Sequence, residues 1–217
     1  MWNFLSDTVH RGLEFNILLS QRAIGIMSSI PLTKPVLLLI DNQVGLDRSA
    51  PRSTPTYEEN IPRLLSAFRA RGYPVFHVAH HSIDPNSKLN PKTNPGGEDF
   101  YPFARPIEGE PVFVKHVNSA FIGTNLEEKL REVGVKELVV AGLTTDHCVS
   151  TSVRMAANLA ITGEEGVVYL VEDATGTWGK GGWDAETVHK VHVASLDDEF
   201  ASIVTTKDVV QAVENSV

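Results

Sequence analysis

The feature that most constrains the fold is a continuous apolar run, "PVLLLID", at residues 35–41. A strand that faces solvent on one side alternates apolar and polar residues, whereas this run is apolar up to its final aspartate. Such a run is typical of a strand that is covered on both faces, and strands of that kind occur mostly in parallel sheets. The run therefore predicts an α/β fold.

Further runs and helical patterns extend this prediction along the chain. Five more candidate strands lie at residues 73–81, 110–117, 136–142, 166–173 and 200–206. Helical patterns separate most of them: one ends at Gly72, a second ends at Gly134, a third follows Cys148, and a fourth follows Asp184. Alternating strands and helices of this length indicate a parallel sheet with helices on both faces.

Three helix starts are predicted from capping residues. Thr124 and Glu127 have the spacing of a capping box. Asp184 precedes a helical pattern that extends over residues 184–199, and it can cap that helix. Asp146 is expected to cap the helix that follows it.

Length and charge bound the class of protein. The chain has 217 residues, 42% of them hydrophobic, which fits one globular domain with a full core. We place this domain at residues 31–217 and treat residues 1–30 as an N-terminal extension with an amphipathic helical pattern. The formal net charge is −8 and no basic stripe is present, so we expect a small-molecule substrate, with no nucleic acid and no membrane as partner.

The chain contains a single cysteine, Cys148. One cysteine cannot form an internal disulfide or a Cys-rich zinc site, so the sequence suits a reducing compartment and predicts a cytoplasmic protein. Cys148 then has two interpretations, a packed core residue or a reactive thiol. Taken alone, the packed residue is favoured.

Two irregular segments are candidates for covering a site. Residues 80–109 and 174–184 are rich in Gly, Pro or Asn and lack periodicity, which in a compact domain is typical of functional loops. Trp178 and Trp183, both in the second segment, are expected to wall a pocket.

Three chemically active residue types lie at predicted strand ends. Asp41 follows the first strand, Lys115 ends the third, and Cys148 lies just beyond the fourth. Ligands of open parallel sheets bind at the carboxyl ends of the strands, where the strand order reverses. Each residue alone has an ordinary structural interpretation, but their joint position predicts a site.

The sequence resembles the isochorismatase-like cysteine hydrolases from about Pro35 to Thr206. The matching segments are "LLLIDNQ" with Asp41, "VKHVNSAFIGTNL" with Lys115, and "VAGLTTDHCVSTSVRMA" with Cys148. The resemblance implies a three-layer αβα Rossmann-like sandwich with a six-stranded, mostly parallel sheet in the order 3-2-1-4-5-6. It also implies a homo-oligomer.

The resemblance also implies roles for individual residues. Asp41, Lys115 and Cys148 would form a catalytic triad, and the backbone N–H groups of Thr144 and Cys148 would form the oxyanion hole. A cis peptide would precede Thr144. Phe121 lines the pocket in relatives, and Gln43 and Trp178 are the other residues expected in the substrate pocket. A helix N-terminus and the Lys115 ammonium would lower the thiol pKa, while Asp41 would act as base and then as acid.

Metal and cofactor are expected to be absent. Nicotinamidases of this superfamily bind a divalent metal through an aspartate and histidines, but the corresponding stretch here reads "HVAHHS", with Ala79 in place of the aspartate. His80 and His81 are then interpreted as polar residues at a strand end.

Three functions remain open from the sequence. The first is a metal-independent cysteine amidohydrolase that cleaves a C–N bond of a small amide through a thioester. The first alternative is an isochorismatase that hydrolyses a vinyl ether with Asp41 as proton donor. The second alternative is a non-catalytic binding protein on the same fold.

Overall fold

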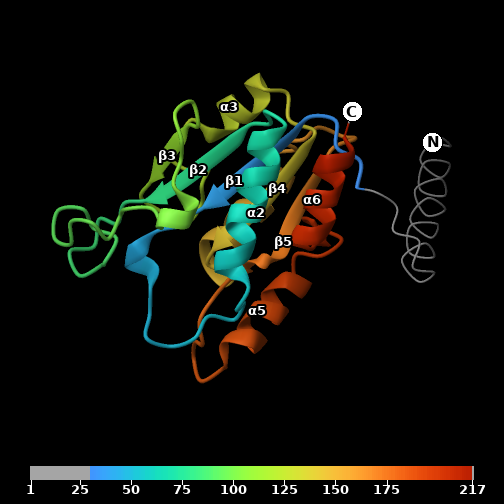
Figure 1. Ribbon diagram of the computed structural model, residues 1–217. Coiled ribbons are helices and arrows are strands. Elements are labelled where there is room, and N and C mark those ends of the chain that lie inside the picture. The colour runs from blue at the N-terminus through green and yellow to red at the C-terminus, as the bar shows by residue number, and fades with distance from the viewer. Residues whose placement is uncertain (1–29, 217) are drawn as a thin grey trace, which may run out of the picture. The chain divides into compact units, whose positions relative to one another are not determined.

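Six parallel strands form one sheet in the order β3-β2-β1-β4-β5-β6 (Figure 1). The computed structural model describes residues 30–216, so the predicted N-terminal extension, apart from residue 30, lies outside the described residues. The strands are β1 Pro35–Ile40, β2 Val75–His80, β3 Val112–Lys115, β4 Glu137–Leu143, β5 Val167–Gly176 and β6 Ser202–Val204. The predicted fold class and strand order are confirmed.

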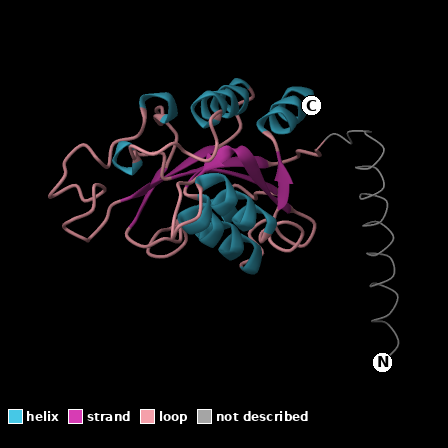
Figure 2. Cartoon of the chain, turned by 90° about the horizontal axis from the view of Figure 1, so that it is seen from below, coloured by secondary structure: helices cyan, strands magenta, loops and turns pink. Residues whose placement is uncertain are grey.

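Helices cover both faces of this sheet (Figure 2). The helices are α2 Tyr57–Ala70, α3 Leu126–Glu132, α4 Ser150–Asn158, α5 Ala185–Ala194 and α6 Thr206–Asn215. Helices α2 and α6 pack against each other and against β5, whereas α3, α4 and α5 contribute to a hydrophobic cluster with the strands. In residues 30–216 no helix is long and apolar enough to cross a bilayer.

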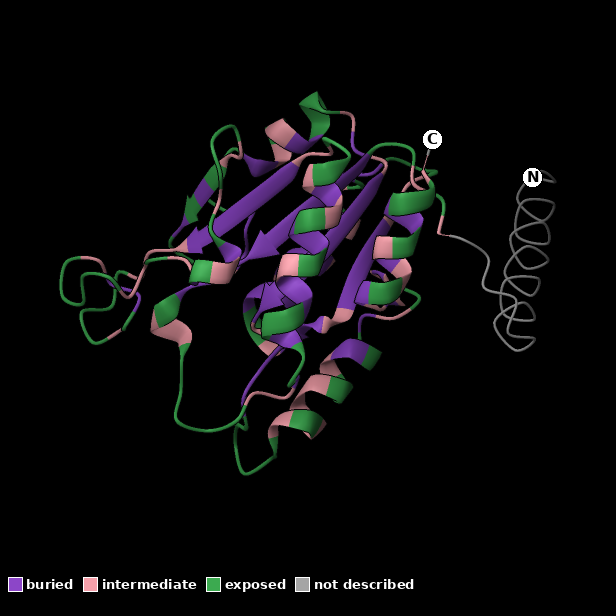
Figure 3. Cartoon of the chain, in the orientation of Figure 1, coloured by how far each residue is buried: buried purple, intermediate pink, exposed green. Residues whose placement is uncertain are grey.

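The apolar residues of β1 pack against helices on both faces of the sheet. Val36, Leu38 and Ile40 belong to the cluster with α3 and α4, while Leu37 and Leu39 are equally buried and, by strand alternation, face the opposite layer. Figure 3 shows the central strands buried along their length. Burial on both faces explains why the strand is apolar at every position.

Helix capping agrees with the sequence in one case and differs in another. Asp184 caps α5, because its carboxylate accepts a hydrogen bond from the Thr187 N–H at 2.8 Å. The predicted capping box at α3 is not formed: the N-cap is Asn125, without a side-chain cap bond, and Glu127 makes no bond back to the Thr124 N–H within the described residues. The Thr124 hydroxyl accepts a hydrogen bond from the Leu126 N–H at 3.3 Å and donates one to the Ala120 carbonyl at 2.6 Å, so it ties the helix start to the preceding turn.

The junction of β1 and β4 requires a glycine. Gly142 has φ of +127°, and a Cβ at this position would lie 2.1 Å from the Ile40 carbonyl oxygen. A larger residue would therefore push β1 and β4 apart immediately before Asp41. The strand order also reverses between β1 and β4, and this switch point is where open α/β sheets bind ligands.

Candidate active site

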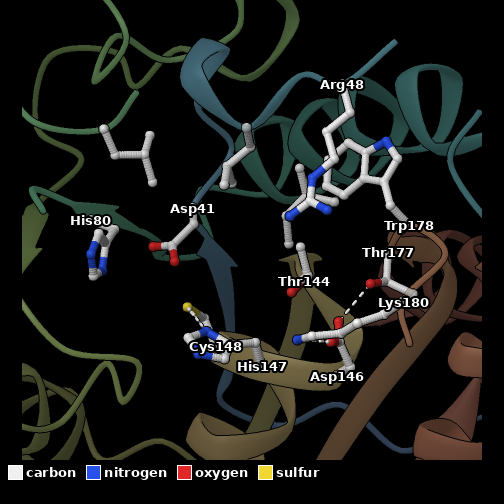
Figure 4. A pocket seen from close by; sticks show the side chains of 13 residues that line it. Asp41, Arg48, His80, Thr144, Asp146, His147, Cys148, Thr177, Trp178 and Lys180 are labelled. Atoms are coloured by element: carbon white, nitrogen blue, oxygen red, sulfur yellow. Dashed lines mark hydrogen bonds and ion pairs between the residues drawn. The ribbon is translucent and has the colours of Figure 1, made fainter. Parts of the chain in front are cut away.

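A cavity of about 230 Å³ lies at the carboxyl ends of β1 and β4 (Figure 4). This volume lies below the range of about 300–1,000 Å³ that is usual for drug-sized ligands, so the cavity suits a smaller molecule. Its walls come from the ends of β1, β2 and β4 and from the loops that follow them and β5. The lining residues are Asp41, Leu46, Arg48, His80, Leu89, Leu143, Thr144, Asp146, His147, Cys148, Thr177, Trp178 and Lys180.

Asp41, Lys115 and Cys148 meet at this cavity, as the strand-end argument predicted. The Lys115 Nζ donates to Asp41 Oδ2 at 2.7 Å and to Cys148 Sγ at 3.3 Å. The side chains of Lys115 and Asp41 are 0% and 2% exposed, and Cys148 is buried. The three groups therefore interact in surroundings of low dielectric, where their mutual electrostatic effects are large.

Local structure at the end of β4 places the thiol. The peptide between Leu143 and Thr144 is cis, as the resemblance implies. The chain then forms a five-residue π-helix, η3 (Thr145–Val149), which continues into α4. Cys148 is thus near the start of the helical segment, and it packs in the same cluster as the strands.

His80 is a fourth member of the group, and the sequence did not predict this role. It ends β2, which lies between β1 and β3, and it is paired in register with Lys115. Its Nδ1 lies 3.1 Å from the Lys115 Nζ. Since a lysine ammonium has three N–H donors, Asp41, Cys148 and His80 together account for all of them.

The electrostatics of His80 agree with an acceptor role. Burial, together with the nearby Lys115 charge, lowers the pKa of His80 to about 4. The ring is therefore neutral near pH 7, and because Nδ1 accepts from Lys115, its proton is on Nε2. His80 holds the lysine amine between the carboxylate and the thiol.

The same cluster resembles a metal site but does not fit a resident metal. Ligand atoms of Asp41, His80 and Cys148 lie within 4.8 Å of one another. However, the Lys115 Nζ donates to all three, and an ammonium has no lone pair with which to bind a metal. Ala79, where the resemblance would place a metal-binding aspartate, is a buried β2 residue and offers no ligand atom.

The thiol pKa differs from the sequence expectation. Burial raises the pKa of the Cys148 thiol, the Asp41 carboxylate raises it further, and Lys115 opposes both without reversing them. Burial also raises the pKa of Asp41, against the lowering effect of Lys115. This direction is opposite to the expected lowering of the thiol pKa, because burial and the neighbouring Asp41 carboxylate both favour the neutral thiol.

This arrangement predicts how Cys148 labelling depends on pH. Iodoacetamide labelling of the native protein should rise along a curve displaced to higher pH than that of free cysteine, because only the thiolate reacts. Asp41→Asn removes a charge that disfavours the thiolate, so its curve should move back to lower pH. The labelling rate can be followed by intact mass, since the chain has one cysteine. A wild-type curve below that of free cysteine would contradict the structure.

The residues implied for the oxyanion hole and pocket are found in different places. Thr144 and Trp178 line the cavity with Cys148. Phe121 is buried in the hydrophobic cluster and, contrary to the prediction, does not line this cavity.

Gln43 binds the backbone beside the cavity. Its amide donates to the carbonyls of His80 and Glu98 at 3.2 and 2.8 Å, and it accepts from the His80 N–H at 2.7 Å. Gln43 therefore joins the end of β2 to the segment that follows it. In this position it fixes the backbone of the residue that contacts Lys115.

Asp146 does not cap the helix, contrary to the prediction. Burial would raise its pKa, but hydrogen bonds from Thr177 and Lys180 lower the pKa to about 2. The Lys180 Nζ lies 3.0 Å from Asp146 Oδ2. Asp146 thus ties the loop after β5 to η3, and Trp178 of this loop lines the cavity. Trp183, which was also expected to wall a pocket, is 67% exposed and does not line this cavity.

Arg48 and His147 also line the cavity, and neither was predicted from the sequence. Arg48 follows η1 (Val44–Leu46) and lines the cavity. His147 is exposed, and its Nδ1 lies 3.3 Å from Cys148 Sγ. The position of His147 next to Cys148 was a usable signal, but nothing in the local sequence of Arg48 indicated the direction of its side chain.

The fold and the site define an α/β protein with a small-molecule cavity at the switch point of its sheet and a buried thiol in that cavity. Residues 35–208 match the isochorismatase domain. The chain belongs to the isochorismatase family of hydrolases.

Individual relatives agree with this assignment. The chain is 38% identical over 184 residues to the isochorismatase family protein YrdC of Bacillus subtilis, covering 82% of this chain and 95% of the relative. A solved structure from Chromobacterium violaceum, assigned to the isochorismatase family of hydrolases, is 40% identical with a TM-score of 0.80, covering 87% and 99% of the two chains. A shorter match, 32% over 104 residues, is to ureidoacrylate amidohydrolase RutB of Rhizobium rhizogenes, covering 46% of this chain and 40% of that one.

Proposed function

We propose that this protein is a metal-independent cysteine amidohydrolase that cleaves a C–N bond of a small amide through a thioester on Cys148. The observation that carries the proposal is the shared donor, Lys115, which holds the Asp41 carboxylate and the Cys148 thiol together at the cavity. The amidohydrolase named among the relatives supports the same reaction class.

Asp41 has one carboxylate oxygen available for proton transfer. Oδ2 accepts from Lys115, whereas Oδ1 is buried and has no hydrogen-bond partner within residues 30–216. Because the resting thiol is neutral, its proton must leave as the sulfur attacks the amide carbon. Asp41 is the base that can take this proton, and burial, which raises the pKa of its carboxyl, makes it a stronger base.

The remaining steps return the proton and release the products. Attack forms a C–S bond and places negative charge on the carbonyl oxygen, which the backbone N–H groups of Thr144 and Cys148 would stabilise. Asp41 then gives its proton to the leaving nitrogen, the C–N bond breaks, and an amine or ammonia departs. Water, with Asp41 again as base, hydrolyses the thioester to the acid and restores the thiol.

The thioester itself is the sharpest test of this proposal. A panel of small primary amides and ureido compounds is mixed with the protein after exhaustive chelation, quenched in acid, and analysed by intact mass. We expect an adduct on Cys148 with the mass of the substrate less its leaving amine, and ongoing release of that amine. Cys148→Ala is the matched control and should carry no adduct.

Two results would contradict the proposal. Loss of turnover on chelation, restored by one equivalent of a divalent metal, would show that a metal is required. Absence of any adduct or amine release across the panel would favour the non-catalytic binding protein. Homo-oligomerisation and a cytoplasmic location stay predictions.

A further inference from the structure

Arg48 points into the cavity and stacks on an aromatic wall (Figure 4). Its guanidinium carbon lies 5.2 Å from the centroid of the Trp178 ring, within the range of a cation–π interaction. This contact holds the plane of the guanidinium but uses none of its N–H donors. A guanidinium held in this way still presents its fork of donors to a ligand.

The charges around the cavity are unbalanced. Two carboxylates, those of Asp41 and Asp146, have their own cations: Lys115 pairs with Asp41 at 2.7 Å and Lys180 pairs with Asp146 at 3.0 Å. Arg48 makes no ion pair or hydrogen bond with the part of the chain that the structure describes. Within residues 30–216, one positive charge at the cavity therefore has no ion-pair partner.

The acid next to Arg48 in sequence is already engaged. Asp47 accepts from the Tyr101 hydroxyl and from Arg52, so it faces the neighbouring loop residues. The chain as a whole carries a net charge of −8, and its average field repels anions. Arg48 is an exposed residue that lines the cavity, so an anion that enters the cavity from solvent can reach its guanidinium despite the net negative charge of the chain.

We propose that Arg48 is an anion subsite and that the substrate is a small amide that carries a carboxylate. The inference rests on the proposed amidohydrolase function, because it identifies the end of the substrate remote from the scissile bond. A carboxylate matches the guanidinium fork with two parallel hydrogen bonds between opposite charges, which are stronger than the bonds a neutral acceptor makes. With the amide carbon at Cys148, a monoamide of a short dicarboxylic acid has the required chemistry for a cavity of about 230 Å³.

The subsite can be tested without a substrate, by labelling Cys148 with a charged and a neutral reagent. Iodoacetate and iodoacetamide react with the same thiolate and differ in the carboxylate. The rate with iodoacetate divided by the rate with iodoacetamide should fall about fivefold or more in Arg48→Gln, as expected for the loss of one nearby unit charge. In Arg48→Lys, which keeps the charge, this ratio should fall less. Lys129→Gln is the matched control: it removes the same charge from α3, outside the cavity, and its ratio should equal that of wild type.

The second test uses paired substrates. Succinamate and its methyl ester differ only in the charge of the group remote from the amide. Wild type should prefer succinamate, and Arg48→Gln should reduce the preference ratio in kcat/KM at least about tenfold through KM, as expected for one lost charge-assisted hydrogen bond. Lys129→Gln should keep the wild-type preference.

The two tests separate the two proposals. If amides are hydrolysed but neither ratio changes in Arg48→Gln, the anion subsite is wrong and the amidohydrolase stands. If no amide is hydrolysed but the labelling ratio falls in Arg48→Gln, the amidohydrolase is wrong and the subsite for a carboxylate stands.

Discussion

Cys148→Ala is expected to reduce amide turnover by at least about 10⁴-fold, the scale of loss when a nucleophile is removed from a catalytic triad. The variant has no sulfur to form the thioester, and Asp41, Lys115 and the backbone N–H groups cannot replace the covalent route. The measurement is kcat/KM on the best amide of the panel, with single-turnover release of amine as a check. Cys148→Ser should also be nearly inactive, because an alcohol in this environment is much harder to deprotonate than a thiol.

The same variant separates the amide reaction from vinyl-ether hydrolysis. Isochorismate cleavage needs a proton from Asp41 and no nucleophile, so Cys148→Ala should leave that reaction largely intact while Asp41→Asn abolishes it. Thermal unfolding provides the control that Cys148→Ala is folded. Equal isochorismate turnover by wild type and Cys148→Ala, with no amide hydrolysed by either, would establish the alternative function and exclude the thioester.

Most of the sheet could be predicted because buried parallel strands leave a strong pattern. The run at residues 35–41 is apolar at each position since both of its faces are covered. By contrast, α6 (Thr206–Asn215) was not predicted, although Thr205 and Asp208 form a capping box at its start. The strand β5 is also longer than predicted: Thr175 and Gly176 pair with Gly142 and Leu143, so the ladder continues into residues that resemble a loop.

The candidate site could be predicted as far as strand ends determine it. Asp41, Lys115 and Cys148 lie where their strands end, and strand ends converge in any parallel sheet. Contacts made by long or ring side chains depend on details that the pattern does not contain, such as the register that places His80 beside Lys115. The direction of the thiol pKa was also beyond the sequence, because it depends on how completely Cys148 is buried and on the carboxylate beside it.

The buried pair of Lys115 and Asp41 should have the largest effect on stability. Lys115→Met leaves a buried carboxylate without its cation, and Asp41→Asn leaves a buried cation without its carboxylate. Each single change should destabilise the fold by about 3–5 kcal/mol, the usual result of breaking a buried ion pair from one side. Both variants should also lose amide turnover.

The double variant, Asp41→Asn with Lys115→Met, distinguishes a buried pair from two independent residues. It contains no unpaired buried charge, so it should recover most of the stability that either single change loses, while remaining inactive because the base and the shared donor are both absent. Chemical denaturation of the four proteins gives the coupling free energy directly. If the two losses simply add in the double variant, the ion pair does not stabilise the site as the structure implies.

The pH dependence of Lys115→Met tests the same pair from another direction. Removing Lys115 removes a group that lowers the pKa of Asp41, so the pKa of this carboxyl should rise further above its unfolded value of 3.8. A group whose pKa is raised by folding stabilises the fold below its unfolded pKa, and this contribution is lost as the pH rises through the folded pKa. The variant should therefore be closest to wild type in acid, where Asp41 is protonated, and fall progressively behind as the pH rises. A stability difference that does not change with pH would show that Asp41 carries no buried charge for Lys115 to balance.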